Sequence, residues 1–224
     1  RIAVFENFDK AGGQAQDSLL KTLEEPPPHA VLLLIATSLE PILSTITSRS
    51  QIIHLRPISA ESIRTVLSTH YEVENDLAGR LGRISGGRIA WAINAAQNPD
   101  TLEDRTRALE ILDDLIRGDY IHRFKVAEEF GKYVSKPKDK QWLATQLELW
   151  LSYWRDVLLM TENSPIKPCN DDFRVSMEQL MYGIQPEDAL RAVRATRTML
   201  NNLKYNINVR LSLEVMFLDY PGLP

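Results

Sequence analysis

Strand-like and helix-like patterns alternate over about the first 57 residues of the chain. The short apolar run Ile2–Phe5 predicts a strand, and leucines at helical spacing predict a helix over Ala15–Glu25, which the following proline run ends. The continuous apolar run Ala30–Ala36 is typical of a central parallel strand covered on both faces. Gln51–Leu55 predicts a third strand, ended by Pro57. Strands that alternate with helices through short links predict a parallel α/β sheet.

After Pro57 the strand patterns stop and short helices are expected. Ser59 is placed to cap a helix, and two more short apolar patterns follow it. The turn-forming Gly86-Gly87 pair lies between the second and third of these helices, and Asn98-Pro99-Asp100 closes the group. Residues 58–101 therefore read as a small helical bundle.

Every pattern from Leu102 onward is helical. One predicted helix, Leu143–Met160, carries apolar residues on more than one face, so it is expected at the centre of its bundle or at a subunit interface. The proline-containing stretch Glu162–Asp172 is the most loop-like segment, and two further helices are expected over Pro186–Tyr205 and Val209–Asp219.

The composition fits a soluble globular protein. Of 224 residues, 44% are apolar and 25% charged, and the apolar runs are far shorter than the roughly 20 residues of a membrane span. A single cysteine, Cys169, excludes an internal disulfide and a multi-cysteine zinc site and fits a reducing cytoplasm. The net charge of -4 disfavours a broad nucleic-acid-binding face. The chain opens on Arg1 directly before a buried-strand pattern, which suggests that further sequence precedes it.

Three sequence blocks follow one another at consistent spacing: RIAVFENFDK at the start, LLKTLEEPP over residues 19–27, and Ser48-Arg49-Ser50 after the second apolar run. Together they resemble the bacterial DNA polymerase III clamp-loader AAA+ family, in which they belong to the second half of the AAA+ core. The block NINVRLSLEVMFL near the C-terminus is also similar to the end of this family's chains. Within the family, the chain looks like the non-hydrolysing delta-prime type.

The resemblance implies an α/β AAA+ (RecA-like) partial domain over residues 1–57, an all-α lid over 58–101 and an all-α collar over 102–224. It also implies a role in ATP-dependent loading of the sliding clamp onto primed DNA. In the family, the arginine of the Ser-Arg-Cys motif, here Arg49, reaches the nucleotide of a neighbouring subunit as an arginine finger. Ser50 replaces the motif's cysteine and Ser44 a usual upstream proline, and neither change removes the guanidinium. The alternative is a surface arginine in an ion pair.

The residues at the family's own nucleotide site are degenerate. Glu6 and Asn7 stand where the family has Asp-Glu, and an amide cannot act as a general base. Ser38 takes the usual sensor position after the second strand, with a turn serine as the alternative. In the lid, Trp91 falls where the family has a sensor arginine, with Arg88 three residues earlier. The family's phosphate loop lies upstream of Arg1. We therefore expect no metal or cofactor on this chain and ATP with Mg²⁺ on the neighbouring subunit.

The expected partners are the gamma/tau and delta subunits, the beta sliding clamp indirectly, and primer-template DNA through the complex. We expect no membrane among the partners. We also expect a location in the bacterial cytoplasm and no ATPase activity of this chain alone. Two alternatives remain: an ATP-hydrolysing gamma/tau-type subunit, and a structural helical adaptor without a catalytic role.

Two basic clusters add weaker signals. Arg191, Arg194 and Arg197 recur at a spacing of three, and Lys136, Lys138 and Lys140 lie in a predicted loop. Each is either a solvated surface or a contact with a partner subunit or nucleic acid.

Overall fold

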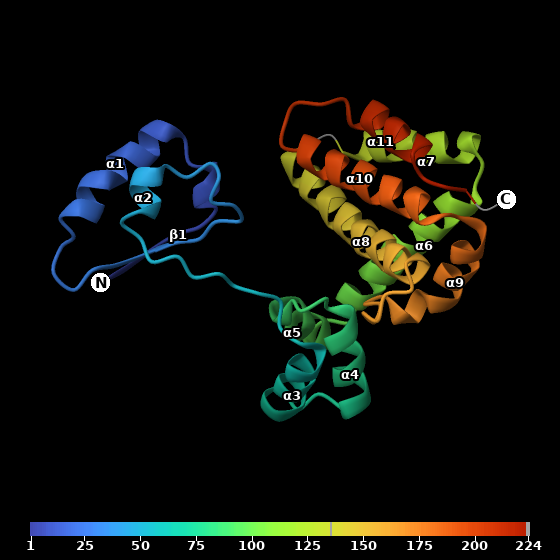
Figure 1. The fold of residues 1–224 in the computed structure, drawn as a ribbon, viewed down its shortest axis with the longest axis horizontal. Coiled ribbons are helices and arrows are strands. Elements are labelled where there is room, and N and C mark those ends of the chain that lie inside the picture. The colour runs from blue at the N-terminus through green and yellow to red at the C-terminus, as the bar shows by residue number, and fades with distance from the viewer. Residues whose placement is uncertain (135, 223–224) are drawn as a thin grey trace. The chain divides into compact units, whose positions relative to one another are not determined.

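A computed structural model describes residues 1–134 and 136–222 of the chain, except for the side chains of residues 137 and 138. The chain divides into two compact units, Arg1–Arg56 and Pro57–Pro224 (Figure 1). The predicted order, a parallel α/β segment followed by helices, is present. No helix of the described residues is long and apolar enough to cross a membrane.

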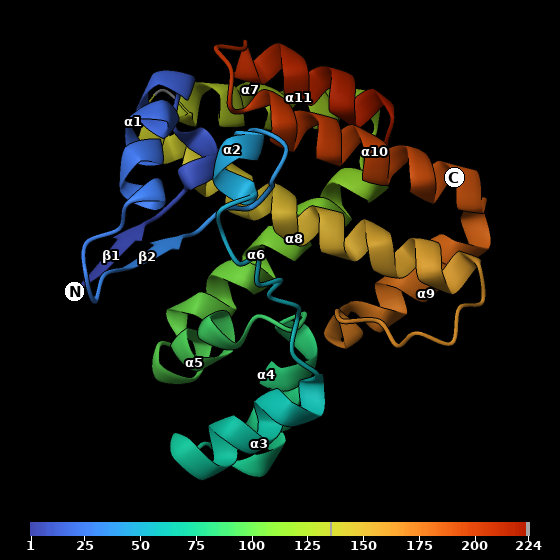
Figure 2. The same ribbon diagram turned by 60° about the vertical axis from the view of Figure 1, so that its left-hand side comes forward.

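The first unit contains a parallel pair of strands, β1 (Ile2–Phe5) and β2 (Val31–Leu34) (Figure 2). Between them lie the 3₁₀ turn η1 (Phe8–Lys10) and helix α1 (Gly13–Glu24). Helix α1 ends before the proline run, because proline has no backbone N–H to continue the hydrogen-bond ladder. The one-turn helix α2 (Ser44–Thr47) follows β2.

The expectation that Ala30–Ala36 is covered on both faces is wrong. Side chains alternate along β2, so that Leu32 and Leu34 are half-buried while Val31 and Leu33 are exposed. A strand presents successive side chains to opposite faces of the sheet. Among the described residues of the unit, only one of those faces is packed.

The predicted third strand is also wrong. Residues 51–59 have no regular secondary structure, and Leu55 is 92% exposed. The apolar, β-branched composition of Gln51–Leu55 favours a strand, but a strand forms only where a neighbour accepts its backbone hydrogen bonds. In the described part of the chain, β1 and β2 pair only with each other.

The second unit begins with the three predicted short helices, α3 (Ala60–His70), α4 (Asn75–Ile84) and α5 (Ile89–Gln97). Ser59 caps α3 as predicted: its Oγ accepts a hydrogen bond from the backbone N–H of Ser62 at 3.1 Å. The three helices enclose their own apolar cluster, formed by Ile63, Leu67, Ala78, Leu81, Ile84, Ala92 and Ala95.

Gly87 fixes how the chain enters this bundle. Its φ of +85° is a conformation that side chains disfavour, and a Cβ at this position would collide with Pro57. The carbonyl of Gly87 accepts a hydrogen bond from the N–H of Ile58 at 3.0 Å. The Gly86-Gly87 turn therefore holds the segment that leads into α3.

Six further helices follow among the described residues of the unit: α6 (Asp100–Arg117), α7 (Tyr120–Tyr133), α8 (Pro137–Thr161), α9 (Arg174–Gly183), α10 (Pro186–Asn202) and α11 (Val209–Leu218), with a 3₁₀ turn η2 (Asp171–Phe173) before α9. Helix α8 packs against α6, α9 and α10, so its several apolar faces place it at the centre of the bundle. The sequence pattern did not predict α9.

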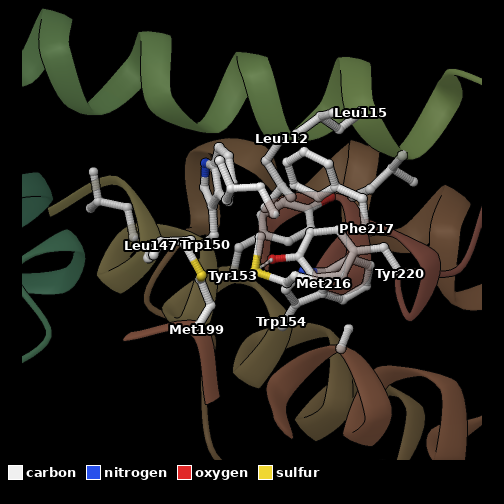
Figure 3. Close-up of a cluster of buried hydrophobic side chains, with 14 of the residues drawn as sticks. Leu112, Leu115, Leu147, Trp150, Tyr153, Trp154, Met199, Met216, Phe217 and Tyr220 are labelled. Carbon is white, nitrogen blue, oxygen red and sulfur yellow. Dashed lines mark hydrogen bonds between the residues drawn. The ribbon is translucent and has the colours of Figure 1, made fainter. Parts of the chain in front are cut away.

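The core around α8 is aromatic (Figure 3). Trp150 is fully buried, and its indole N–H donates to the carbonyl of Ala108 in α6 at 2.7 Å. Trp154 meets Tyr220 edge to face with ring centroids 5.1 Å apart, and Trp150 lies 6.1 Å from Phe217. These contacts fix α8 to α6 and to the end of α11.

Candidate functional site

Glu6, Asn7 and Ser38 lie at one edge of the two-stranded sheet. The strands are parallel and in register, so the residues that follow them leave at the same edge. Backbone hydrogen bonds continue the pairing beyond the strands: Ile35 N–H donates to Phe5 O at 2.9 Å, and Phe8 N–H donates to Ile35 O at 2.8 Å. The three residues that the sequence placed at the degenerate nucleotide site thus follow the same ends of two paired strands.

Each of the three has limited chemistry. Glu6 and Asn7 are exposed and line an open depression of about 720 Å³ next to the start of α1. Asn7 adopts a left-handed φ of +53°, and its carbonyl accepts the N–H of Lys10. The Oγ of Ser38 accepts the N–H of Glu40 at 3.2 Å, as in a turn serine. Glu6 offers a carboxylate for a cation, whereas Asn7 offers only a neutral amide.

A hydrogen-bonded pair at this edge, Thr37 and Asp9, was not predicted from the sequence. Thr37 Oγ1 donates to Asp9 Oδ2 at 2.7 Å, and this hydrogen bond holds the pKa of the Asp9 carboxyl below its ordinary value. The pair joins the turn after β1 to the end of β2. The signal available in the sequence was that polar residues follow both strands.

Arg49 follows α2 on a tight turn. Its N–H donates to the carbonyl of Ile46 at 3.1 Å, and its Nη1 donates to the carbonyl of Thr45 at 3.1 Å. Its Nη2 lies 3.0 Å from Oε1 of Glu24, and 41% of the Arg49 side chain stays exposed. The guanidinium is therefore at the surface, in a single exposed ion pair.

Arg49 does not converge with the residues of the strand edge. Glu24, its ion-pair partner, is the last residue of α1, whereas α1 begins just after the turn that follows β1. At 1.5 Å per residue, the 12 residues of α1 separate its two ends by roughly 16 Å. The Arg49 guanidinium thus lies near the opposite end of α1 from the turn that carries Glu6 and Asn7.

Trp91 and Arg88 lie in the second unit, around the start of α5. Trp91 is half-buried, and the Arg88 guanidinium carbon lies 5.8 Å from the centroid of the Trp91 ring. Arg88 also donates through Nε to the carbonyl of Ser85 at 3.0 Å and lies 3.9 Å from Glu148 of α8. These contacts of the Arg88 guanidinium all lie within its own unit.

The residues of the two basic clusters differ in the contacts that they make. Arg191 pairs with Asp188 at 2.7 Å, while Arg194 and Arg197 are exposed without an ion pair to any described residue. Arg191 and Arg194 border a groove of about 600 Å³ between α10 and α11. Lys140 donates to the carbonyl of Tyr205 at 3.0 Å. Lys136 is exposed, and the side chain of Lys138 lies outside the described residues.

Comparison with known proteins indicates what the chain resembles. Residues 1–59 match the family model for DNA polymerase III, delta subunit. Over 221 residues the chain is 23% identical to DNA polymerase III subunit delta′ of Bacillus subtilis (strain 168). The chain resembles a delta-prime clamp-loader subunit. The resemblance inferred from the sequence blocks is confirmed.

The coverage of the two matches differs. The alignment with the delta-prime subunit of B. subtilis includes 97% of this chain and 65% of that protein, so the chain spans slightly less than two thirds of the relative's length. The family match covers the whole first unit and ends at the start of the helical one. It therefore includes Glu6, Asn7, Ser38 and Arg49.

Proposed function

We propose that this chain is the delta-prime-type subunit of a bacterial DNA polymerase III clamp loader. The observation that carries the proposal is the match of residues 1–59 to the family, with Arg49 exposed on the turn after α2. In this proposal residues 1–57 belong to the AAA+ core, 58–101 form the lid and 102–224 form the collar. The partners are the gamma/tau and delta subunits, and the beta clamp and primer-template DNA are reached through the complex in the cytoplasm.

Arg49 acts in trans in this proposal. A guanidinium stays charged at physiological pH and presents a planar fork of N–H donors that matches phosphate oxygens. The ion pair with Glu24 is exposed on both sides, and such pairs contribute less than about 1 kcal/mol. A phosphate on a neighbouring subunit, with its larger charge, can therefore replace Glu24 as the partner of Arg49. ATP and Mg²⁺ would be held by that neighbour.

The chain's own strand edge supports a role without hydrolysis. Asn7 cannot take a proton from an attacking water, and Ser38 uses its Oγ within its own turn. Trp91 carries no positive charge, and the nearby Arg88 lies three residues earlier, where its Nε donates to the carbonyl of Ser85. These features disfavour the gamma/tau-type alternative.

The experiment compares the full-length subunit alone, the other subunits without it, and the complete reconstituted complex. We expect no ATP hydrolysis by the subunit alone and clamp- and DNA-stimulated hydrolysis only in the complete complex. Hydrolysis by the isolated subunit would favour the gamma/tau-type alternative. Equal stimulated hydrolysis with and without the subunit would contradict a role in the clamp loader's ATPase cycle.

A further inference from the structure

Gln16 is a buried amide in a unit whose strands are largely exposed. Its side chain is 2% exposed, and it is the one polar residue of Arg1–Arg56 among the buried residues that the structure describes. Burying an amide costs free energy unless its donors and acceptor are paired. Gln16 is therefore a place where the fold fixes specific partners.

The partners of Gln16 lie on two separate segments. Its Nε2 donates to the carbonyl of Ala11 at 2.9 Å and to the carbonyl of Pro41 at 3.0 Å. Its Oε1 accepts the backbone N–H of Leu43 at 2.9 Å. Ala11 belongs to the turn after β1, while Pro41 and Leu43 belong to the segment that enters α2. One side chain thus fastens the start of α2 to the start of α1.

Helix α2 depends on such anchoring. It is a single turn of four residues, and an isolated helical turn is unstable because it fixes many dihedral angles for very few hydrogen bonds. Leu43 is its N-cap residue, and the carbonyl of Leu43 accepts the N–H groups of Ile46 and Thr47. Ile46, 1% exposed, is the buried apolar contact of the turn. Gln16 provides the polar contacts.

The position of Arg49 follows from α2. Its backbone N–H is bonded to Ile46 O and its Nη1 to Thr45 O, so the arginine is built onto the same turn that Gln16 holds at Leu43. We infer that Gln16 is a positioning residue for Arg49: its three hydrogen bonds fix the direction in which the guanidinium is presented. This inference rests on the proposed arginine-finger function.

The test uses the full-length subunit in the reconstituted clamp loader. Gln16→Met keeps the length and apolar volume of the side chain but removes all three hydrogen bonds. The matched control is Gln14→Met, at an exposed position of the same helix. We expect Gln16→Met to lower kcat for stimulated ATP hydrolysis by about ten- to a hundredfold, the effect of a displacement of about 1 Å in a catalytic group. KM for ATP and assembly of the complex should stay unchanged, as in the control.

Epistasis with Arg49 separates positioning from general structural support. In an Arg49→Ala background, Gln16→Met should cause no further loss of kcat, because the group that it positions is already absent. A kcat equal to that of Gln14→Met would overturn the inference, and so would an undiminished loss in the Arg49→Ala background. If Arg49→Ala alone leaves hydrolysis unchanged, the proposed finger fails and the inference fails with it.

A second measurement covers the case in which Gln16→Met does not assemble. Gln16→Glu retains an acceptor for Leu43 but loses both amide donors, and amide hydrogen exchange can follow it in the full-length subunit. We expect faster exchange at Leu43, Ile46 and Arg49 than in the Gln14→Met control. Unchanged exchange at these three amides would overturn the inference.

Discussion

Arg123 is a single buried side chain that joins the ends of two helices. It is 3% exposed and donates through Nε to Leu115 O, through Nη1 to Phe217 O and Tyr220 O, and through Nη2 to Ile116 O and Pro221 O. The last carbonyls of a helix have no partner within the helix. Arg123 supplies donors for the ends of α6 and α11 together, although burial lowers the pKa of its guanidinium.

We predict that Arg123→Met lowers the free energy of unfolding by about 3 kcal/mol, because it leaves several buried carbonyls without donors. Urea denaturation followed by circular dichroism measures the change. The control is Lys125→Met, an exposed position of the same helix, for which a change below about 0.5 kcal/mol is expected. Equal effects of the two substitutions would contradict the assigned role of Arg123.

Asp156 gives a prediction on pH. It is fully buried in α8, and its Oδ2 accepts the N–H groups of Cys169 and Asn170. Burial is the main cause that raises the pKa of this carboxyl above its ordinary value, against these hydrogen bonds. The folded protein therefore holds the proton more tightly than the unfolded chain. The contribution to stability is complete below the ordinary carboxyl pKa and is lost as the pH rises through the raised folded value.

Asp156→Asn removes this titration. Urea unfolding of the wild type and of Asp156→Asn across the acidic range should show the wild type losing stability relative to the variant as the pH rises. A difference that moves in the opposite direction with pH would contradict the raised pKa of Asp156.

Individual residues of the candidate site were predictable only through the sequence blocks that resemble the family and the spacing between those blocks. Glu6, Asn7 and Arg49 were located by their places in the blocks, and Ser38 by its position after the second apolar run. Gln16 and Arg123 were not, because their partners lie up to 27 and 98 residues away, and no local pattern reports such distant contacts. A buried glutamine on an amphipathic helix looks like a solvated one in the sequence.

The Ser59 cap allows a prediction at the scale of an element. We expect Ser59→Ala to lower the free energy of unfolding of the helical unit by about 1 kcal/mol, because the Ser62 N–H loses its acceptor. Chemical denaturation measures this change. Ser68→Ala, inside the same helix, is the control and should be nearly neutral, since alanine is a good helix former. A Ser59→Ala variant as stable as the control would argue against the cap.

Helices were more predictable than strands because a helix satisfies its own backbone hydrogen bonds. The long apolar stripe of α8 therefore appears where the pattern placed it. Gln51–Leu55 has strand composition but no paired neighbour in the described chain, so it is extended and exposed. Helix α9, in which only Met177 and Leu180 are buried, was missed by the pattern.

Across the whole molecule, the two units differ in the size of their apolar cores. Pro57–Pro224 contains two apolar clusters, one among α3–α5 and one around α8. In Arg1–Arg56, Phe8 and Ile46 are the buried apolar residues that the structure describes. Every residue of β1 except Ala3 is exposed, and so is every second residue of β2. The helical unit thus has the larger core, and burial of apolar surface is the main source of stability.

We predict that residues 57–224, expressed alone, fold into a helical protein that unfolds cooperatively, whereas residues 1–56 alone do not. Circular dichroism during thermal and urea unfolding of the two fragments measures this. A fragment 57–224 that lacks a cooperative transition would show that the helical unit needs the first one.

The division of the chain into units was not readable from hydrophobic pattern alone. Pro57 marks the end of the strand-like segment, but the boundary depends on which contacts form across it, and those are contacts of the folded state. The pattern could name the helices on each side. It could not determine how much of the sheet the described residues would bury.

In the proposed function, Arg49 acts on a nucleotide held by a neighbouring subunit. The most direct measurement is single-turnover ATP hydrolysis by the reconstituted clamp loader with Arg49→Ala in this subunit, compared with Arg56→Ala, an exposed arginine of the same unit. We predict that Arg49→Ala slows hydrolysis at the one site it faces by a factor on the order of 10³, with the complex still assembled, while Arg56→Ala has the wild-type rate. Wild-type single-turnover kinetics in the Arg49→Ala complex would contradict the action of Arg49 in trans.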